Sequence, residues 1–179
     1  MAADAQPGWN RSPASLIDKL HSDDPTTARQ ARAELVALGP AALPYLMALL
    51  SDSHRTARWE AAKALGELDI PEAAPALVQA LQDEDGGVRW LAADALARCD
   101  LVGLDALLHE LLHHSDSPWL REGAHHVLSS LAEVGVLPAP VRPVLRALEE
   151  VAPEVGVLNA SARALEELNL HRYASWQAP

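Results

Sequence analysis

Histidines are the residues of this chain whose type and spacing could do chemistry. Four of its eight histidines fall between positions 113 and 126, as the pairs His113-His114 and His125-His126, and His109 lies one helical turn earlier. On a helix, His109 and His113 would share one face, and side chains at that i, i+4 spacing can bind a transition metal together. If the two segments were adjacent helices, one histidine of the second pair could complete the set.

A solvated histidine cluster is the simpler interpretation of the same residues. Neighbouring positions on a helix differ by about 100° in direction, so His125 and His126 cannot both face His109. No second set of histidines with this spacing occurs elsewhere in the chain. We therefore expect no bound metal or other cofactor, and we keep a metal site at His109, His113 and His125 as an alternative.

A repeated segment supplies the elements that must position these side chains. The similar stretches TARQARAELVALG, TARWEAAKALGEL and GVRWLAADALARC begin at positions 27, 56 and 87, and two weaker copies follow. Each copy precedes a second leucine-rich stretch such as AAPALVQALQD. The copies are anchored by leucines at separations of 30, 31, 32 and 37 residues, namely Leu35, Leu65, Leu96, Leu128 and Leu165.

This repeat predicts an all-α fold. Alternation of apolar and polar residues with a period of two, which would indicate strands, is absent, and the abundant Leu and Ala favour helix. Pro44 and Pro75 lie near the expected starts of second helices, where a missing N–H has no partner to lose. We predict one domain, a right-handed α-solenoid of about five helical hairpins over residues 11–170. A flexible segment, 1–10, would precede it, and a tail or cap, 171–179, would follow it.

Composition and charge limit the classes of function. The 179 residues are enough for one sizeable core, and 49% of them are hydrophobic, which favours a folded chain over disorder. The net charge of −11 argues against nucleic-acid binding, which needs a basic face, and it favours a basic protein as the partner. The single cysteine, Cys99, is typical of a reducing compartment. We find no secretory signal and no apolar run of about 18 residues, so we expect a soluble cytoplasmic protein with no membrane contact.

An acidic residue six positions before an arginine, followed by an alanine-rich helix, recurs in these copies. It occurs as Asp52 and Arg58 before AAKALG, and as Asp83 and Arg89 before AADALA. This pattern resembles HEAT repeats, specifically the short bacterial type that is also found in phycobilin lyase subunits. The resemblance covers roughly residues 23–169.

The resemblance implies a structural role for these charged residues, because in HEAT repeats such side chains usually tie adjacent hairpins together. One guanidinium can hold a carboxylate and the carbonyl oxygens of a helix end at the same time. Arg29 is one place out of register with the alanines, and the fifth copy has Leu158 at the arginine position. We expect a structural ladder made of Asp23, Arg29, Asp52, Arg58, Asp83, Arg89 and Arg121.

Two sets of outward positions are candidates for binding a partner. In HEAT stacks the second helices line the concave side, and here their outward residues are Tyr45, Gln79, Gln82, His109, His113, Arg146 and Glu150. Trp59 and Trp90 each follow a repeated arginine and lie 31 positions apart, so they would stack as an aromatic strip on the first-helix layer. The alternatives are plain solvated surface for the first set and packing between repeats for the second.

These features favour a binding protein over an enzyme. The chain has no glycine-rich phosphate loop, and none of its serines has the context of a catalytic nucleophile. We predict a non-catalytic scaffold or adaptor that presents a HEAT-repeat groove to another protein. The resemblance to phycobilin lyase subunits implies one alternative, a protein that handles a tetrapyrrole. The cluster of His109, His113, His125 and His126 gives the other, a metal-binding protein.

Overall fold

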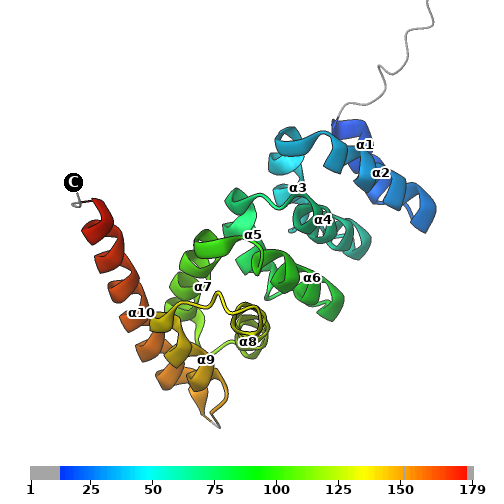
Figure 1. The fold of residues 1–179 in the computed structure, drawn as a ribbon. Helices are drawn as coiled ribbons and strands as arrows, with labels where there is room; N and C mark the ends of the chain where they lie inside the picture. The colour runs from blue at the N-terminus through cyan, green and yellow to red at the C-terminus, as the bar shows by residue number, and fades with distance from the viewer. Residues whose placement is uncertain (1–12, 151, 177–179) are drawn as a thin grey trace, which may run out of the picture.

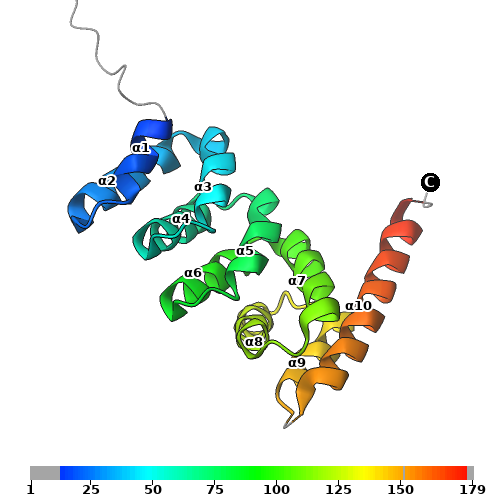
Figure 2. The same cartoon turned by 180° about the vertical axis from the view of Figure 1, so that it is seen from behind.

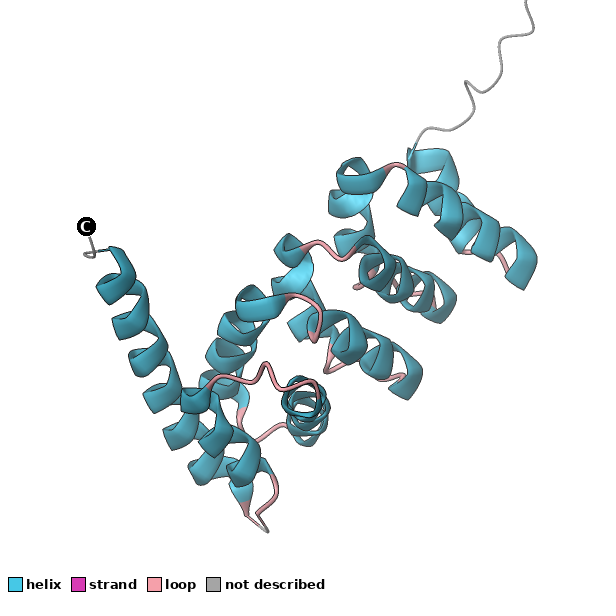
Figure 3. Cartoon of the chain, in the orientation of Figure 1, coloured by secondary structure: helices cyan, strands magenta, loops and turns pink. Residues whose placement is uncertain are grey.

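Helices joined by short turns and loops make up the part of the chain that the structure describes. The structure is a computed structural model. It describes the backbone of residues 13–150 and 152–176 and the side chains of residues 13–99, 101–150 and 152–169. No strand occurs among these residues, as the colouring of Figure 3 shows. The predicted all-α class is confirmed, and the predicted flexible segment 1–10 lies outside the described residues.

The helices are arranged in two layers that run side by side through the stack (Figures 1 and 2). The first layer consists of α2 (Pro25–Ala37), α4 (Arg55–Leu68), α6 (Gly86–Leu96) and α8 (Pro118–Glu133). The second layer consists of α3 (Leu43–Leu49), α5 (Ala74–Ala80), α7 (Asp100–His114) and α9 (Arg142–Leu148). Helix α1 (Pro13–Leu20) packs against α2 and starts the stack.

Tight turns join the two layers within a repeat. Three 3-10 turns precede α3, α5 and α9, namely η1 (Gly39–Ala42), η2 (Pro71–Ala73) and η3 (Ala139–Val141). As predicted, a proline occupies the first turn of each of these helices, where no intrahelical hydrogen bond is lost. The first-layer helices pack on one another in chain order, so the predicted α-solenoid of helical hairpins is confirmed.

The last helix departs from this order. Helix α10 (Pro153–Trp176) follows α9 and packs mainly against α9 and α7. It therefore leaves the first layer and borders the second-layer side of the stack (Figure 1). Its backbone continues to Trp176, through most of the segment predicted as a separate tail or cap, 171–179. The side chains of that segment lie outside the described residues.

Leucines from both layers form the core. The five anchoring leucines are 0–6% exposed, and burial of such a side chain contributes about 2 kcal/mol. Cys99, just before α7, is buried as well. At Gly103 the start of α7 comes so close to α6 that an added Cβ would lie 2.8 Å from the carbonyl oxygen of Leu96. None of the described helices is both long enough and apolar enough to cross a membrane.

Candidate functional site

Arg58 ties two consecutive repeats together. Its Nε and Nη2 atoms donate to the carboxylate oxygens of Asp83 at 2.7 and 3.1 Å, and its Nη1 donates to the carbonyl oxygen of Asp52 at 3.0 Å. The side chains of Arg58 and Asp83 are 8% and 6% exposed, so this is a buried bidentate ion pair. The hydrogen bond that Arg58 donates to Asp83 raises the pKa of Arg58 above its ordinary value. One guanidinium therefore caps the turn after α3 and also holds the next repeat.

Arg89 and Arg121 repeat this arrangement with looser second contacts. Each Nη1 donates to the carbonyl oxygen six positions earlier, at 2.9 Å for Arg89 and 2.7 Å for Arg121. The Nη2 of Arg89 lies 3.9 Å from the carboxylate of Glu122, and that of Arg121 lies 3.4 Å from Glu154. The contact with the carbonyl group is thus the constant feature, while the ion pair to the next repeat varies in strength.

Asp23 and Arg29, which we expected in the ladder, do not take part in it. Both side chains are exposed, and neither makes an ion pair or hydrogen bond with the part of the chain that the structure describes. The cap of α2 is Asp24, whose carboxylate accepts from two backbone N–H groups of the first turn at 3.1 and 3.2 Å. Arg29 points to solvent because Ala28 faces the core.

Arg32 and Glu60 form a buried ion pair that sequence reasoning missed. Nη1 of Arg32 donates to Oε2 of Glu60 at 2.6 Å, and its Nε lies 3.2 Å from Oε1 of Glu67. The pair joins α2 to α4, and its two side chains are 10% and 7% exposed. Opposite charges 28 positions apart, close to one repeat length, were the signal that could have indicated it.

His21 takes the place of the arginine at the first rung of the ladder. Its Nε2 lies 3.0 Å from Oδ2 of Asp52, and the backbone N–H of His54 donates to Oδ1 of the same carboxylate at 2.7 Å. This backbone hydrogen bond, with the two histidine rings, lowers the pKa of Asp52 to about 2. The hydrogen bond with Asp52 raises the pKa of His21. The separation of His21 and Asp52, 31 positions, is one repeat length, a signal that sequence reasoning did not use.

A surface pocket of about 430 Å³ lies between the second-layer helices α5 and α7. Three of the residues predicted to contact a partner line it together, namely Gln79, His109 and His113. The side-chain amides of Gln79 and Gln82 donate to the two carboxylate oxygens of Glu110 at 3.0 and 3.2 Å. Polar side chains of two successive repeats are therefore held in register on this face.

The other predicted contact residues lie on neighbouring repeats. Tyr45 is on α3 and is 43% exposed. Arg146 is exposed on α9 and lines a separate pocket of about 640 Å³ with Arg142 and Leu145. Glu150 is exposed just after α9. The second-layer residues thus extend over several repeats, and only the set between α5 and α7 is gathered at one pocket of the described chain.

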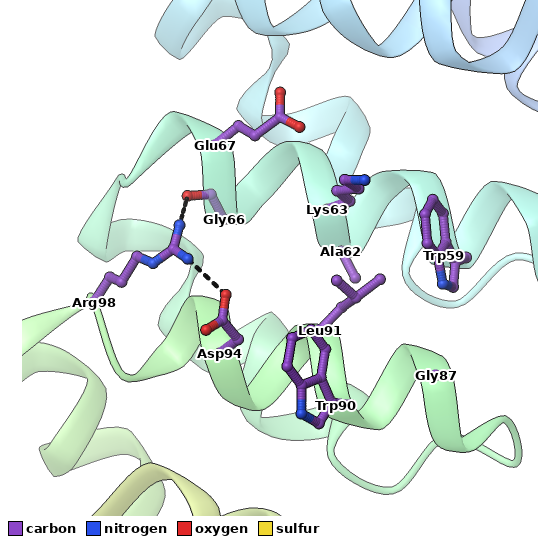
Figure 4. A pocket seen from close by; sticks show the side chains of 10 residues that line it. All are labelled: Trp59, Ala62, Lys63, Gly66, Glu67, Gly87, Trp90, Leu91, Asp94 and Arg98. Atoms are coloured by element: carbon purple, nitrogen blue, oxygen red, sulfur yellow. Dashed lines mark hydrogen bonds and ion pairs between the residues drawn. The ribbon is translucent and has the colours of Figure 1, made fainter. Parts of the chain in front are cut away.

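Another pocket of about 430 Å³ lies on the first layer, between α4 and α6 (Figure 4). Both residues of the expected aromatic strip, Trp59 and Trp90, line it. The ammonium group of Lys63 lies 4.9 Å from the centre of the Trp59 ring, within the range of a cation–π contact. At the opposite end, Arg98 donates to the carbonyl oxygen of Gly66 at 2.9 Å and so bridges the two helices.

The two tryptophans differ in what they contact. Trp59 is partly buried and packs against the core, whereas Trp90 is 56% exposed. Trp90 also lines a pocket of about 420 Å³ between α6 and α8, together with Arg89, His125 and His126. The rings of Trp90 and His126 lie 6.1 Å apart. The exposed aromatic surface is therefore centred on Trp90 and is not an even strip.

The histidine cluster is divided between the two faces of the stack. His109 and His113 line the pocket between α5 and α7, whereas His125 and His126 line the pocket between α6 and α8. The Nδ1 atoms of His109 and His113 each lie 2.8 Å from the carbonyl oxygen four positions earlier. Among the described residues, three ligand atoms of the metal-binding type gather at the first rung of the ladder, around His21.

A family model matches this architecture. The family described as HEAT repeats matches residues 13–97 and 43–129, which together make up more than half of the chain. The chain belongs to the HEAT repeat family. The arginine ladder and the two helical layers are therefore the framework of a HEAT repeat protein, as the sequence motif predicted. No curated protein matches the chain.

A solved structure is similar over most of this HEAT repeat protein. It is a chain from the complex of CpcE and CpcF of phycocyanin lyase from Nostoc sp. PCC7120, with 26% sequence identity and a TM-score of 0.58. The similarity covers 83% of this chain and 96% of that chain. The predicted resemblance to the HEAT-like repeats of phycobilin lyase subunits is confirmed.

Proposed function

We propose that this HEAT repeat protein is a non-catalytic scaffold that binds another protein along its second-layer face. The observation that carries the proposal is the pocket between α5 and α7, where polar side chains of two repeats are held by hydrogen bonds to Glu110. A partner that meets side chains already held in place loses less conformational freedom on binding. Distributed contacts at repeat spacing are also how solenoid surfaces bind extended partners.

The arrangement of the helices supports the choice of this face. Helix α10 packs on α7 and stands beside the second layer, so α3, α5 and α7 face a space that α10 borders (Figures 1 and 2). A protein segment lying along this side would meet several repeats at once. Exposed residues on α3, α5 and α7, among them Tyr45, Gln79 and His109, are available to such a segment.

The charge of the pocket supports a basic partner. Its lining includes the carboxylates Asp105 and Glu110 and no lysine or arginine. The whole chain has a net charge of −11, which attracts a basic protein at long range. The chain from phycocyanin lyase was solved as part of a complex of two proteins, and this supports a protein as the class of partner.

A pull-down with matched variants tests the proposal. The triple variant Gln79→Ala, His109→Ala, His113→Ala changes exposed side chains, so it should keep the wild-type melting temperature and lose a stoichiometric partner that wild-type bait recovers. The control Trp90→Ala changes the opposite layer and should keep the partner. Loss of the partner with Trp90→Ala, and its retention by the triple variant, would contradict the proposal and assign binding to the first layer.

Tetrapyrrole handling is the second candidate function, and the similarity to a phycocyanin lyase chain is the observation that favours it. The described residues do not single out one side chain as the pigment ligand, so the test uses the whole protein. A linear tetrapyrrole added to the purified chain should change its visible spectrum and saturate at one equivalent if this candidate is correct. An unchanged spectrum at saturating pigment would remove it and leave the scaffold proposal untouched.

A further inference from the structure

The first rung of the arginine ladder contains two imidazoles and one carboxylate. His21 follows α1, Asp52 lies in the turn between α3 and α4, and His54 is the residue before α4. One ligand atom of each residue lies within 4.8 Å of those of the other two. At the next rung the corresponding carboxylate, Asp83, is bound by the guanidinium of Arg58. At the first rung imidazole rings therefore replace a guanidinium as the partners of the carboxylate.

The hydrogen bonds of His21 direct a ring nitrogen at the carboxylate. Its Nδ1 lies 3.1 Å from the carbonyl oxygen of Ile17, which can only accept, so Nδ1 carries the proton. In the neutral ring Nε2 then has a lone pair, and this lone pair faces Oδ2 of Asp52 at 3.0 Å. Either a proton on Nε2, which makes the ring an imidazolium, or a metal ion bound to Nε2 and the carboxylate removes the repulsion between these lone pairs. A histidine whose other N–H donates to a backbone carbonyl is also the usual form of a metal ligand.

His54 supplies a second ring nitrogen to the same carboxylate. Its Nδ1 lies 3.1 Å from Oδ1 of Asp52, and the rings of His21 and His54 are 4.8 Å apart and nearly perpendicular. The backbone N–H of His54 fixes Oδ1 of Asp52 at 2.7 Å, which orients the carboxylate. The His54 side chain is 64% exposed, so its ring is free to turn toward a bound ion.

We propose that His21, Asp52 and His54 bind a divalent transition metal such as Zn²⁺, which would clamp α1 to the turn between α3 and α4. Two imidazoles and one carboxylate suit Zn²⁺, while Mg²⁺ and Ca²⁺ prefer sets made of oxygen ligands. Zn²⁺ with ligands at about 2.1 Å needs ligand atoms about 3.4 Å apart. The close pairs at 3.0 and 3.1 Å therefore have to open slightly, while the wider separations, which are within 4.8 Å, have to contract. Rotation of the exposed His54 ring supplies that movement.

The position of the site gives the metal a structural consequence. Among the described residues, Asp52 has no buried bidentate arginine pair like the one that Arg58 makes with Asp83, although the Arg32–Glu60 pair joins α2 to α4. An ion held by residues from both sides of the first junction of the stack would take the place of such an arginine. The expected result is a higher melting temperature in the presence of Zn²⁺.

The experiment is a titration of the full chain, without a histidine tag and after treatment with a chelator, with Zn²⁺ by calorimetry and with Co²⁺ by visible absorption. The wild type should bind one equivalent and melt at a higher temperature with Zn²⁺. His54→Ala should weaken binding about tenfold or more, because even residues that only orient ligands change metal affinity by that factor. His54→Ala removes an exposed ring, so it should fold like the wild type. His21→Ala should weaken Zn²⁺ binding in the same way.

The matched control is the double variant His109→Ala, His113→Ala, which removes the exposed pair on α7 that has chelating spacing. It should keep the one-equivalent binding and the rise in melting temperature. Failure of the wild type to bind Zn²⁺ would overturn the proposal. Binding that survives His54→Ala and disappears in the double variant would also overturn it, because the ion would then belong to α7.

Discussion

Replacement of Arg58 is the most direct test of how the repeats are held together. In Arg58→Ala, Asp83 loses a bidentate partner at 2.7 and 3.1 Å, and the carbonyl oxygen of Asp52 loses its donor at 3.0 Å. Both members of the ion pair are less than a tenth exposed, so water replaces the guanidinium poorly. Among the described residues, the carboxylate of Asp83 then keeps the hydrogen bond from the backbone N–H of Asp85 at 2.8 Å.

The expected loss of stability follows from this burial. Removal of one partner from a buried ion pair costs about 3–5 kcal/mol, because the remaining charge is left without compensation. We expect the lower end, about 3 kcal/mol, since the neighbouring Glu84 is exposed and lets some water approach. For a protein of this length, that change lowers the melting temperature by roughly 6–12 °C. Arg58→Lys keeps the positive charge but not the planar guanidinium, so its melting temperature should lie between those of the wild type and Arg58→Ala.

Thermal unfolding followed by circular dichroism measures the effect, and Arg55→Ala is the control. Arg55 pairs with Asp85, but its side chain is 64% exposed, so solvent screens the pair and its loss should change little. The double variant Arg58→Ala, Asp83→Ala should lose less stability than the sum of the single changes, because the second removes the charge that the first leaves unpaired. A melting temperature for Arg58→Ala no lower than that of Arg55→Ala would refute the ladder.

Three further predictions concern neighbouring parts of the stack. Arg89→Ala should lower the melting temperature by less than Arg58→Ala, because Arg89 is 20% exposed and its carboxylate partner is 3.9 Å away; an equal or larger drop would contradict this ranking. Gly103→Ala should destabilise the chain by about 1–3 kcal/mol in urea unfolding, because the new Cβ would lie 2.8 Å from the carbonyl oxygen of Leu96. The Arg55 hydrogen bond, with two backbone N–H groups, lowers the pKa of Asp85. Its stabilisation is therefore complete above its unfolded-state pKa of about 3.9 and is lost as the pH falls through the lower folded-state pKa. Asp85→Asn should accordingly lose less stability between neutral and strongly acidic pH than the wild type, and an identical pH profile would contradict this.

The fold could be predicted from the sequence because a solenoid is specified locally. Each repeat carries its own signals, such as an anchoring leucine about 31 residues from the next and a proline like Pro44 or Pro75 in the first turn of a second-layer helix. Each repeat also contacts mainly its neighbours. The contacts that differ between repeats were harder to predict. Arg29 has the same separation from Asp23 as Arg58 has from Asp52, but a shift of register on α2 turns it to solvent.

The candidate sites show the same limit. Sequence spacing grouped His109 and His113 correctly on one face of α7, because i, i+4 positions share a face on any helix. It could not assign His125 and His126 to the opposite layer, since that depends on how α7 and α8 pack. The pairing of His21 with Asp52 depends on three segments meeting at the first junction of the stack, which periodicity alone does not describe.

The fifth copy departs from the arginine motif at the point where α10 leaves the first layer. At every internal rung an arginine of one repeat reaches toward a carboxylate of the next, and Arg121 is the last to do so, through Glu154 at the start of α10. Where α10 would carry the next arginine it has Leu158, which is 40% exposed. Helix α10 packs on α7 and α9 instead of continuing the first layer. The change of one motif residue in the fifth copy therefore accompanies a change of layer, and α10 borders the face that we assign to a partner.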